Sequence, residues 1–255
     1  MNIIFIVMLF AVFVLSICIH EAAHALMALL LGDPGPRNEG RLSLNPLRQM
    51  AAMGTAVAIT LAFLSGGALT LGWGKPVRFD ALKLRVGPNF GTILVAMAGP
   101  LANLVLGVGG AFVLDAIPQS QQFILNTTKL MAGDITAYQR VSGTLPELAL
   151  RGEQLLFAFI LVNVGLFLIN FIPLYPLDGY RILFALLPSR QAVSFRRAEP
   201  YMELIVLFLL FFLPLLLQFG GPGLEVLSPL YWIERGVAAI IFSIVNPLYG
   251  ILPAV

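Results

Sequence analysis

Six apolar segments, each long enough to cross a lipid bilayer, divide this chain. A spanning helix needs about 20 apolar residues. The segments lie at 3–31, 50–72, 89–117, 153–175, 201–219 and 230–251. Of the 255 residues, 59% are hydrophobic and only 11% are charged, which is too much apolar surface for one soluble core. The sequence therefore predicts an all-α polytopic membrane protein with about five to six transmembrane helices.

The polar stretches between these segments are short. The longest of them, 118–152, has 35 residues, whereas separate domains usually begin at about 50 residues. We therefore expect one integral membrane domain over 1–255, with a catalytic core at 1–183 and C-terminal helices at 201–251. A net charge of +2 gives no reason to expect a nucleic-acid partner, so the expected surroundings are the lipid bilayer.

The first apolar segment contains the motif His-Glu-Ala-Ala-His at residues 20–24. Positions i and i+4 share a helix face, so His20 and His24 can bind one metal ion. Glu21 would lie beside that ion, where it can take a proton from a zinc-bound water whose pKa is lowered to about 7. Ionisable side chains this deep in an apolar helix are costly and usually functional, although two histidines that bond neighbouring helices would also fit. The motif predicts one Zn²⁺ per chain.

A third zinc ligand must come from elsewhere in the chain. Catalytic zinc usually has three protein ligands, and the sequence has no third histidine. Cys18, the lone cysteine, precedes His20 by two residues and so points to the other side of the helix. A carboxylate is therefore expected, and Asp178 is the best candidate because Pro173 and Pro176 break the fourth segment just before it. A solvated turn at Asp178 is the alternative. The competing acids at helix ends are Asp115, Glu203, Glu225 and Glu234.

Asparagines mark the inward faces of two segments. Asn163 and Asn170 are seven residues apart, so they share one face of the fourth segment, which should turn towards the other helices. Asn170 could donate a hydrogen bond to an oxyanion or hold a substrate backbone. Asn163 is expected to hold helices together by hydrogen bonds. Asn103, in a third segment rich in Gly and Ala, is expected to face the bundle as part of the packing.

Four stretches, taken in order, resemble the site-2 protease family of intramembrane zinc metalloproteases. They are "HEAAHALMALLLGDPGPRNEGRLSLNPL" at 20–47, "LGWGKPV" at 71–77, "AGPLAN" at 98–103 and "NFIPLYPLDG" at 170–179. The sequence is most similar to the short bacterial branch, which lacks PDZ and CBS domains. The resemblance covers most of 14–183. It departs from the family at 48–52, where a His-x-Asp-Pro-like stretch is common and this chain has Arg-Gln-Met-Ala-Ala.

The resemblance implies a role for each residue of the site. The zinc ligands would be His20, His24 and Asp178. The catalytic glutamate would be Glu21, and the helix-borne asparagine of the family falls on Asn170.

The resemblance also implies an activity, which is hydrolysis of peptide bonds within or near the transmembrane helices of other membrane proteins (regulated intramembrane proteolysis). Loops 32–49 and 71–79 could form a small β element, an edge of which pairs with the opened substrate chain. Three alternatives stay open: a membrane metal-ion transporter that uses the His and Asp side chains, a noncatalytic scaffold, and a different peptidase with Glu203 as third ligand.

A shared zinc site also restricts the topology. Asp178 can meet the two histidines only if the first and fourth segments end on the same side of the membrane. One of the two segments between them must then fail to cross. We predict that 50–72 is a re-entrant hairpin, because Gly66, Gly67 and polar residues interrupt it.

Charge supports this topology. Loops 32–49, 73–88 and 176–200 would share one side and hold 11 of the 15 Lys and Arg residues. The basic side of a bilayer-spanning protein is normally cytosolic. The predicted location is a bacterial inner or plasma membrane, with the N-terminus outside and the active site nearer the cytosolic face.

Overall fold

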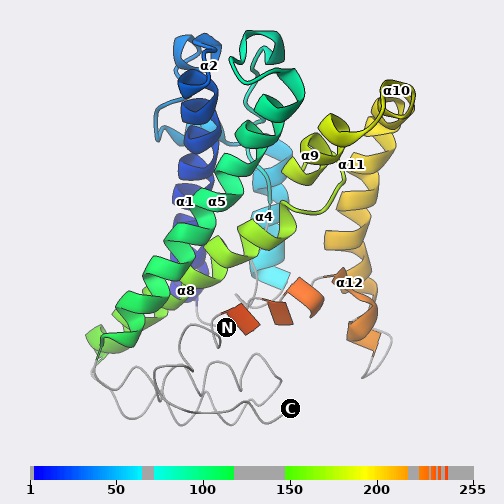
Figure 1. Cartoon of the computed structure of the whole chain (residues 1–255). Helices are drawn as coiled ribbons and strands as arrows, with labels where there is room; N and C mark the ends of the chain where they lie inside the picture. The colour runs from blue at the N-terminus through cyan, green and yellow to red at the C-terminus, as the bar shows by residue number, and fades with distance from the viewer. Residues whose placement is uncertain are drawn as a thin grey trace.

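Three long helices dominate the protein. The computed structural model describes residues 3–64, 72–117, 147–217 and parts of 224–240 (Figure 1). The long helices are α1 (Ile3–Leu30), α5 (Pro88–Asp115) and α8 (Glu147–Ile169). Each contains a stretch long and apolar enough to cross a membrane. Helices account for nearly all regular structure in these ranges, so the prediction of an all-α membrane protein is confirmed.

Shorter elements complete the described ranges. They are α2 (Gly35–Asn38), α3 (Pro46–Gln49), α4 (Ala52–Leu64), η1 (Ala81–Lys83), α9 (Asp178–Leu186), α10 (Ser189–Arg197), α11 (Glu199–Leu207), η2 (Phe208–Phe212), α12 (Leu213–Leu217) and η3 (Leu224–Leu227). The run from α11 through the π-helical turn η2 to α12 is continuous and covers most of the predicted fifth segment. The polar stretch 118–152 and the sixth segment, 230–251, lie largely outside the described residues.

The long helices pack against one another in all three pairs, and α9 packs on α5. In Figure 1, α5 runs back against α1, and α8 then returns towards the end that carries α9. Their contacts are filled by buried apolar side chains, among them Leu9 and Phe13 from α1, Leu114 from α5, and Ile160 and Leu166 from α8. Helix α8 thus runs in the same sense as α1, and its C-terminal end, near mid-height in Figure 1, leads to α9.

The two ends of the apolar segment 50–72 lie side by side. Its described helix, α4, has 13 residues and so extends about 20 Å, short of a full crossing. Met50 and Gly74 form an antiparallel bridge, and the Lys75 N–H donates to the Gln49 carbonyl at 2.6 Å. These contacts agree with the predicted hairpin, although residues 65–71 lie outside the described ranges.

The β element expected in loops 32–49 and 71–79 is reduced to that one bridge in the described residues. Side chains occupy the backbone carbonyls that a ladder would need. Gln49 donates to the carbonyls of Arg41 and Ser43, and Arg41 donates to those of Arg48 and Lys75. Among the described residues, the two loops are therefore joined by the Met50–Gly74 bridge, by the backbone bond from Lys75 to Gln49 and by the Arg41 side chain, without paired strands.

The break after α8 sets the position of Asp178. Helix α8 ends at Ile169, ahead of Pro173, and irregular turns lead to α9, whose first residue is Asp178. The Gly179 N–H donates to the Asn170 carbonyl at 2.6 Å. A Cβ at Gly179 would lie 2.4 Å from the carbonyl oxygen of Ile172, so only glycine allows this close return. The chain thereby folds Asp178 back against the end of α8.

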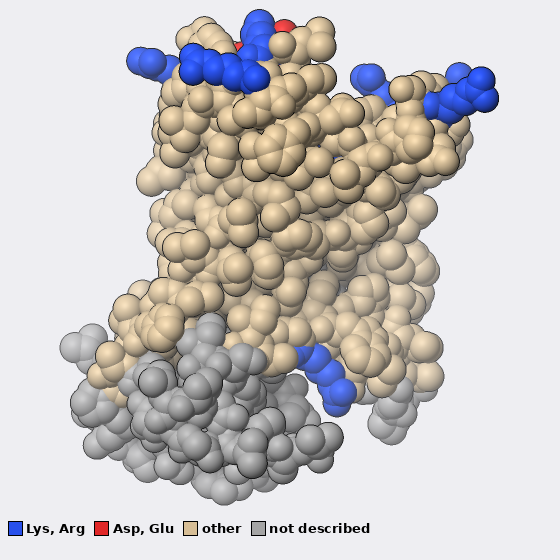
Figure 2. Space-filling view, in the orientation of Figure 1, with Lys and Arg blue, Asp and Glu red and all other residues tan. Residues whose placement is uncertain are grey.

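Basic side chains gather at one end of the face shown in Figure 2, around α2, the start of α5 and α10. Figure 1 places the loops predicted to share a side at this end. The arrangement agrees with the distribution of charge on which the predicted topology depends.

Candidate metal centre

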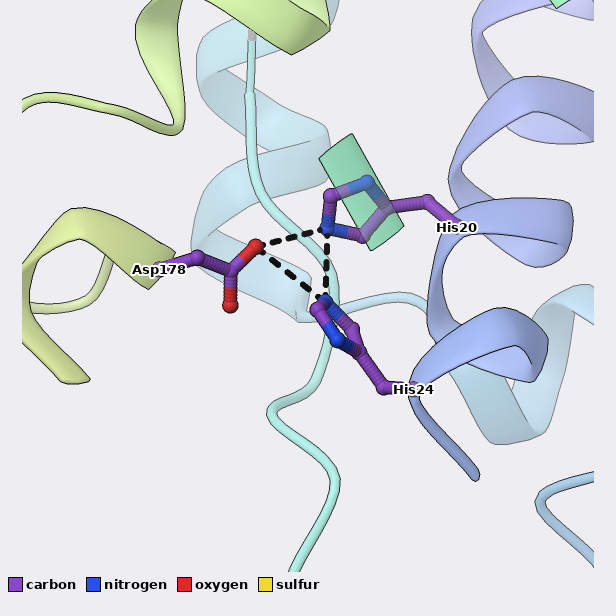
Figure 3. Close-up of side chains that lie close together, drawn as sticks. All are labelled: His20, His24 and Asp178. Atoms are coloured by element: carbon purple, nitrogen blue, oxygen red, sulfur yellow. Dashed lines mark hydrogen bonds and ion pairs between the residues drawn. The ribbon is translucent and has the colours of Figure 1, made fainter. Parts of the chain in front are cut away.

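Two imidazoles and a carboxylate meet between the long helices (Figure 3). His20 and His24 project from one face of α1, and Asp178 projects from the start of α9. Asp178 Oδ2 lies 3.0 Å from Nε2 of His20 and 3.1 Å from Nε2 of His24, and the two Nε2 atoms lie 3.0 Å apart. All three residues are buried, and they form the metal-competent group found among the described His, Cys, Asp and Glu side chains.

The contacts of the other ring nitrogens show that both histidines carry a hydrogen on Nδ1. His24 Nδ1 lies 2.6 Å from the Val95 carbonyl, which can only accept, so this nitrogen carries the hydrogen. His20 Nδ1 faces the side-chain oxygen of Asn103 and likewise donates. Neutral rings in this state turn the Nε2 lone pairs towards the carboxylate of Asp178. In that neutral form, two nitrogen lone pairs and a carboxylate oxygen converge, which is a donor set that a zinc ion can bind.

The spacing of these atoms suits a small tetrahedral ion. Zinc binds imidazole nitrogen and carboxylate oxygen at about 2.0–2.2 Å, so its ligand atoms lie roughly 3.3 Å from one another. The observed separations of 3.0–3.1 Å are close to this value. Two histidines and one carboxylate also match the donor set of several catalytic zinc sites, which leave one position open. The residues present therefore fit zinc.

A glycine allows α5 to approach the two rings. A Cβ at Gly99 would lie 2.3 Å from Nε2 of His24 and 2.7 Å from Cε1 of His20. Helix α5 continues through Pro100 at this point. Small residues permit such close contact between membrane helices. Gly99 therefore lets α5 close one side of the site, and a larger residue would displace the rings.

Glu21 lies next to the metal-competent group, in the same cavity. The cavity has a volume of about 20 Å³ and is lined by Glu21, both histidines, Asp178, Asn170 and residues of 73–77. That volume is enough for about one water molecule. A Cβ at Gly74 would meet Oε1 of Glu21 at 2.2 Å, so the 73–77 segment passes directly over the carboxylate. Glu21 is thus placed to exchange a proton with a water in the cavity.

Arg41 reaches the carboxylate from the loop after α1. Its Nη2 atom lies 3.6 Å from Oε2 of Glu21, and both side chains are buried. Oε2 accepts no hydrogen bond from any described residue. Burial lowers the pKa of the Arg41 guanidinium, and the charge of Glu21 opposes that shift. Arginine remains charged in proteins, so Arg41 provides a fixed positive charge beside Glu21.

Asn170, the residue directly after α8, lines the cavity. Its side-chain N–H donates to the Leu166 carbonyl at 2.8 Å, and one amide hydrogen remains available for another acceptor. Its own carbonyl accepts from Gly179, as described above. Asn170 therefore combines a backbone contact that positions Asp178 with a side chain that lines the cavity. Both inward-facing asparagines of this helix, Asn163 and Asn170, are buried as expected.

The competing candidates do not join the group. Cys18 is buried but lies outside the cavity lining, as the helix geometry predicts. Glu203 lies on α11 and is not part of the metal-competent cluster in the described residues. The side chains of Asp115, Glu225 and Glu234 lie outside the described residues.

Sequence reasoning did not identify the contacts of Arg41, Gly74 and Gly99. All three lie inside stretches quoted above for the family resemblance, at 20–47, 71–77 and 98–103. Those patterns indicate that the residues matter but carry no information about what each one touches.

Comparison with known proteins identifies the family. Residues 8–213 match peptidase family M50. The chain belongs to this family, which is the site-2 protease family. The resemblance seen in the sequence is thus confirmed, and the match extends beyond the last recognised motif.

Two relatives of this M50 member are named as candidate zinc metalloproteases. YwhC of Bacillus subtilis (strain 168) is 30% identical over 202 residues, which cover 79% of this chain and 78% of YwhC. Rip2 of Mycolicibacterium smegmatis (strain ATCC 700084 / mc(2)155) is 32% identical over 102 residues, which cover 40% of this chain and 38% of Rip2. No solved structure matches the chain.

Proposed function

We propose that this M50 member is an intramembrane zinc metalloprotease. His20, His24 and Asp178 would hold one Zn²⁺, and Glu21 would act as general base and general acid. One observation carries the proposal: Nε2 of His20, Nε2 of His24 and Oδ2 of Asp178 converge within 3.1 Å of one another, beside the buried carboxylate of Glu21, in a bundle of apolar helices. Membership of a peptidase family and the names of both relatives support the same chemistry.

The proposed reaction divides the work between the ion and the chain. When bound, zinc supplies a water of pKa about 7 and polarises the scissile carbonyl. Glu21 takes a proton from the attacking water and then delivers it to the leaving amine. Arg41 keeps the Glu21 side chain near the cavity. The free amide hydrogen of Asn170 donates to the oxyanion or to the substrate backbone.

The proposed substrates are transmembrane segments of other proteins. A helix hides its peptide bonds, so the segment must unwind locally before attack. Unwinding leaves backbone groups that cost several kcal/mol each in lipid unless the enzyme pairs with them. Substrates should therefore carry Gly, Pro or polar residues near the cut. The backbone of 73–77, which borders the cavity, is positioned to pair with the opened chain as an added strand does.

The proposed setting is a bacterial inner or plasma membrane, crossed several times by one integral domain. The basic end seen in Figure 2 would face the cytosol, following the positive-inside rule. The site lies nearer that end, and the N-terminus would be outside.

Replacing Glu21 by Gln tests the function. The amide keeps the size of the side chain but cannot take a proton. We expect purified Glu21→Gln to retain one zinc per chain and to lose cleavage of membrane helices by about 100-fold or more. Zinc content would be measured by elemental analysis and cleavage by gel and mass spectrometry in detergent. Glu203→Gln, on α11 outside the cavity, is the matched control and should match wild type in both assays.

Two results would contradict the proposal. The first is cleavage by Glu21→Gln at the wild-type rate. The second is zinc flux into proteoliposomes that Glu21→Gln leaves unchanged while no helix is cut, which would identify a metal transporter instead. Wild-type protein that binds no zinc and cuts nothing would point to a noncatalytic scaffold.

A further inference from the structure

A chain of buried amides runs from the metal-competent group into the middle of the helix bundle. Asn103 on α5 contacts His20 Nδ1 through its side-chain oxygen. Its amide nitrogen donates to the side-chain oxygen of Asn163 on α8 at 2.8 Å. The amide nitrogen of Asn163 donates to Ser16 Oγ at 2.9 Å and to the Phe159 carbonyl at 2.8 Å. Asn103, Asn163 and Ser16 are completely buried.

The Phe159 carbonyl, at the end of this series of hydrogen bonds, determines which group donates in each of them. The Phe159 carbonyl can only accept, so the Asn163 nitrogen must face it. The Asn163 oxygen then faces Asn103 and must receive the Asn103 N–H. This leaves the Asn103 oxygen, which can only accept, opposite His20. His20 must therefore donate from Nδ1, and in the neutral ring the Nε2 atom is left with a lone pair that points at Asp178.

From this order we infer that Asn103 and Asn163 are positioning residues that hold His20 in its metal-binding tautomer, and that Asn163 acts by preventing the Asn103 amide from turning over. The inference rests on the proposed zinc site. His24 needs no side chain to fix the orientation of its partner, because that partner is the Val95 backbone carbonyl.

Loss of Asn163 would release the orientation. The Asn103 nitrogen would then lack an acceptor in a buried site, which is costly. Turning the amide over would instead bring that nitrogen to His20 Nδ1. His20 would respond by carrying its hydrogen on Nε2 and donating it to Asp178. That arrangement satisfies the metal-free site and competes with zinc, although residue 163 touches neither the ion nor its ligands.

Asn163→Leu is the direct test, with Ser16→Ala as the matched control. Ser16→Ala removes one bond of the chain but leaves Asn163 oriented by the Phe159 carbonyl. Zinc affinity would be measured by chelator competition on full-length protein in detergent. We expect the dissociation constant to rise about 10–100-fold in Asn163→Leu, the usual cost of losing an outer partner of a ligand. Ser16→Ala should stay within about threefold of wild type on the same scale.

A second substitution separates orientation from packing. A carboxylate at 103 can only accept, so it fixes the His20 tautomer without help from Asn163. Asn103→Asp combined with Asn163→Leu should recover most of the lost affinity. If Asn163→Leu fails to fold, Asn103→Leu takes its place beside Ser16→Ala, with a loss of about 10-fold or more expected in the first and a change of less than about threefold in the second.

The tautomer can also be observed directly. The chain has only two histidines, so ¹⁵N-histidine labelling reports on two rings in the metal-free protein at a pH where both are neutral. The hydrogen of one ring should move from Nδ1 to Nε2 in Asn163→Leu and remain on Nδ1 in Ser16→Ala. Equal zinc affinities in Asn163→Leu and Ser16→Ala, or no recovery in a folded double variant, would overturn the inference. Absence of zinc from wild type would instead overturn the proposed function.

Discussion

His20 and His24 share one face of α1, but their surroundings hold the two rings by different means. Around His24, the backbone of α5 supplies the acceptor, the Val95 carbonyl. Around His20, the acceptor is the side chain of Asn103, and its orientation depends on α8. A backbone carbonyl inside a helix cannot turn over or be replaced by substitution, whereas a side-chain amide can do both.

This difference indicates where substitutions can change the metal affinity of the candidate site. We call each histidine with its Nδ1 partner one half of the site. The His24 half is fixed as soon as α1 and α5 pack together. The His20 half needs three helices and a defined order of donors and acceptors, so it is the half in which a distant substitution can alter metal affinity. The predictions below compare Asn163→Leu, which acts on the His20 half, with substitutions that affect both halves or only the His24 half.

The largest effect is expected where both halves meet, at Asp178. Its Oδ2 atom lies within 3.1 Å of both histidines. Asp178→Asn keeps the shape but removes the negative charge, so zinc affinity should fall by more than the roughly 100-fold limit seen for supporting residues. Elemental analysis of the purified variant would show little bound zinc. Stoichiometric zinc in Asp178→Asn would exclude Asp178 as a ligand.

A smaller effect on both halves is expected at Gly99. An added methyl group would lie within 2.7 Å of both histidine rings, and overpacking of this kind costs about 1–3 kcal/mol. Gly99→Ala should therefore lower both the thermal unfolding temperature and zinc affinity. Gly109, on the same helix, has open space around the position of its Cβ. Gly109→Ala should leave both quantities unchanged or slightly raised, and similar losses in the two variants would contradict the role given to Gly99.

The smallest effect on zinc is expected from Val95→Ala, which changes only the His24 half. The substitution removes buried methyl groups and should lower stability by about 1–3 kcal/mol. It leaves the carbonyl that fixes His24 in place, so zinc affinity in the folded protein should change less than about threefold, in contrast to the supporting-residue range. A loss as large as that of Asn163→Leu would show that the two halves do not differ.

Much of the fold follows from the sequence because hydropathy and helix breaks act locally. The apolar runs predict α1, α5 and α8, and Pro173 and Pro176 predict the break that frees Asp178. The motif at 20–24 predicts that His20 and His24 share a helix face. These side chains and Asp178 lie together in the structure, and their role as zinc ligands stays a proposal.

The remaining contacts depend on how the helices cross, which local patterns do not specify. Nothing in the sequence says that Gly99 faces the histidines, because that requires the rotation of α5 against α1. Asn163 does join two helices by a hydrogen bond, to Ser16, as expected. Its bond to Asn103 could not be foreseen, since it depends on a partner from another helix. Arg41 gave no periodic signal, because it lies in an irregular loop.

The separation between the two parts of the candidate ligand set has a consequence for biosynthesis. Asp178 follows His20 by 158 residues, and Asn163 also lies late in the chain. A growing chain inserts and folds from its N-terminus, so α1 enters the membrane long before the residues that complete its metal site have been made. An unfinished or truncated chain that ends before residue 178 lacks the third candidate ligand. If the three side chains bind zinc as proposed, proteolytic capacity would arise only after Asp178 has been made and has folded back against the end of α8.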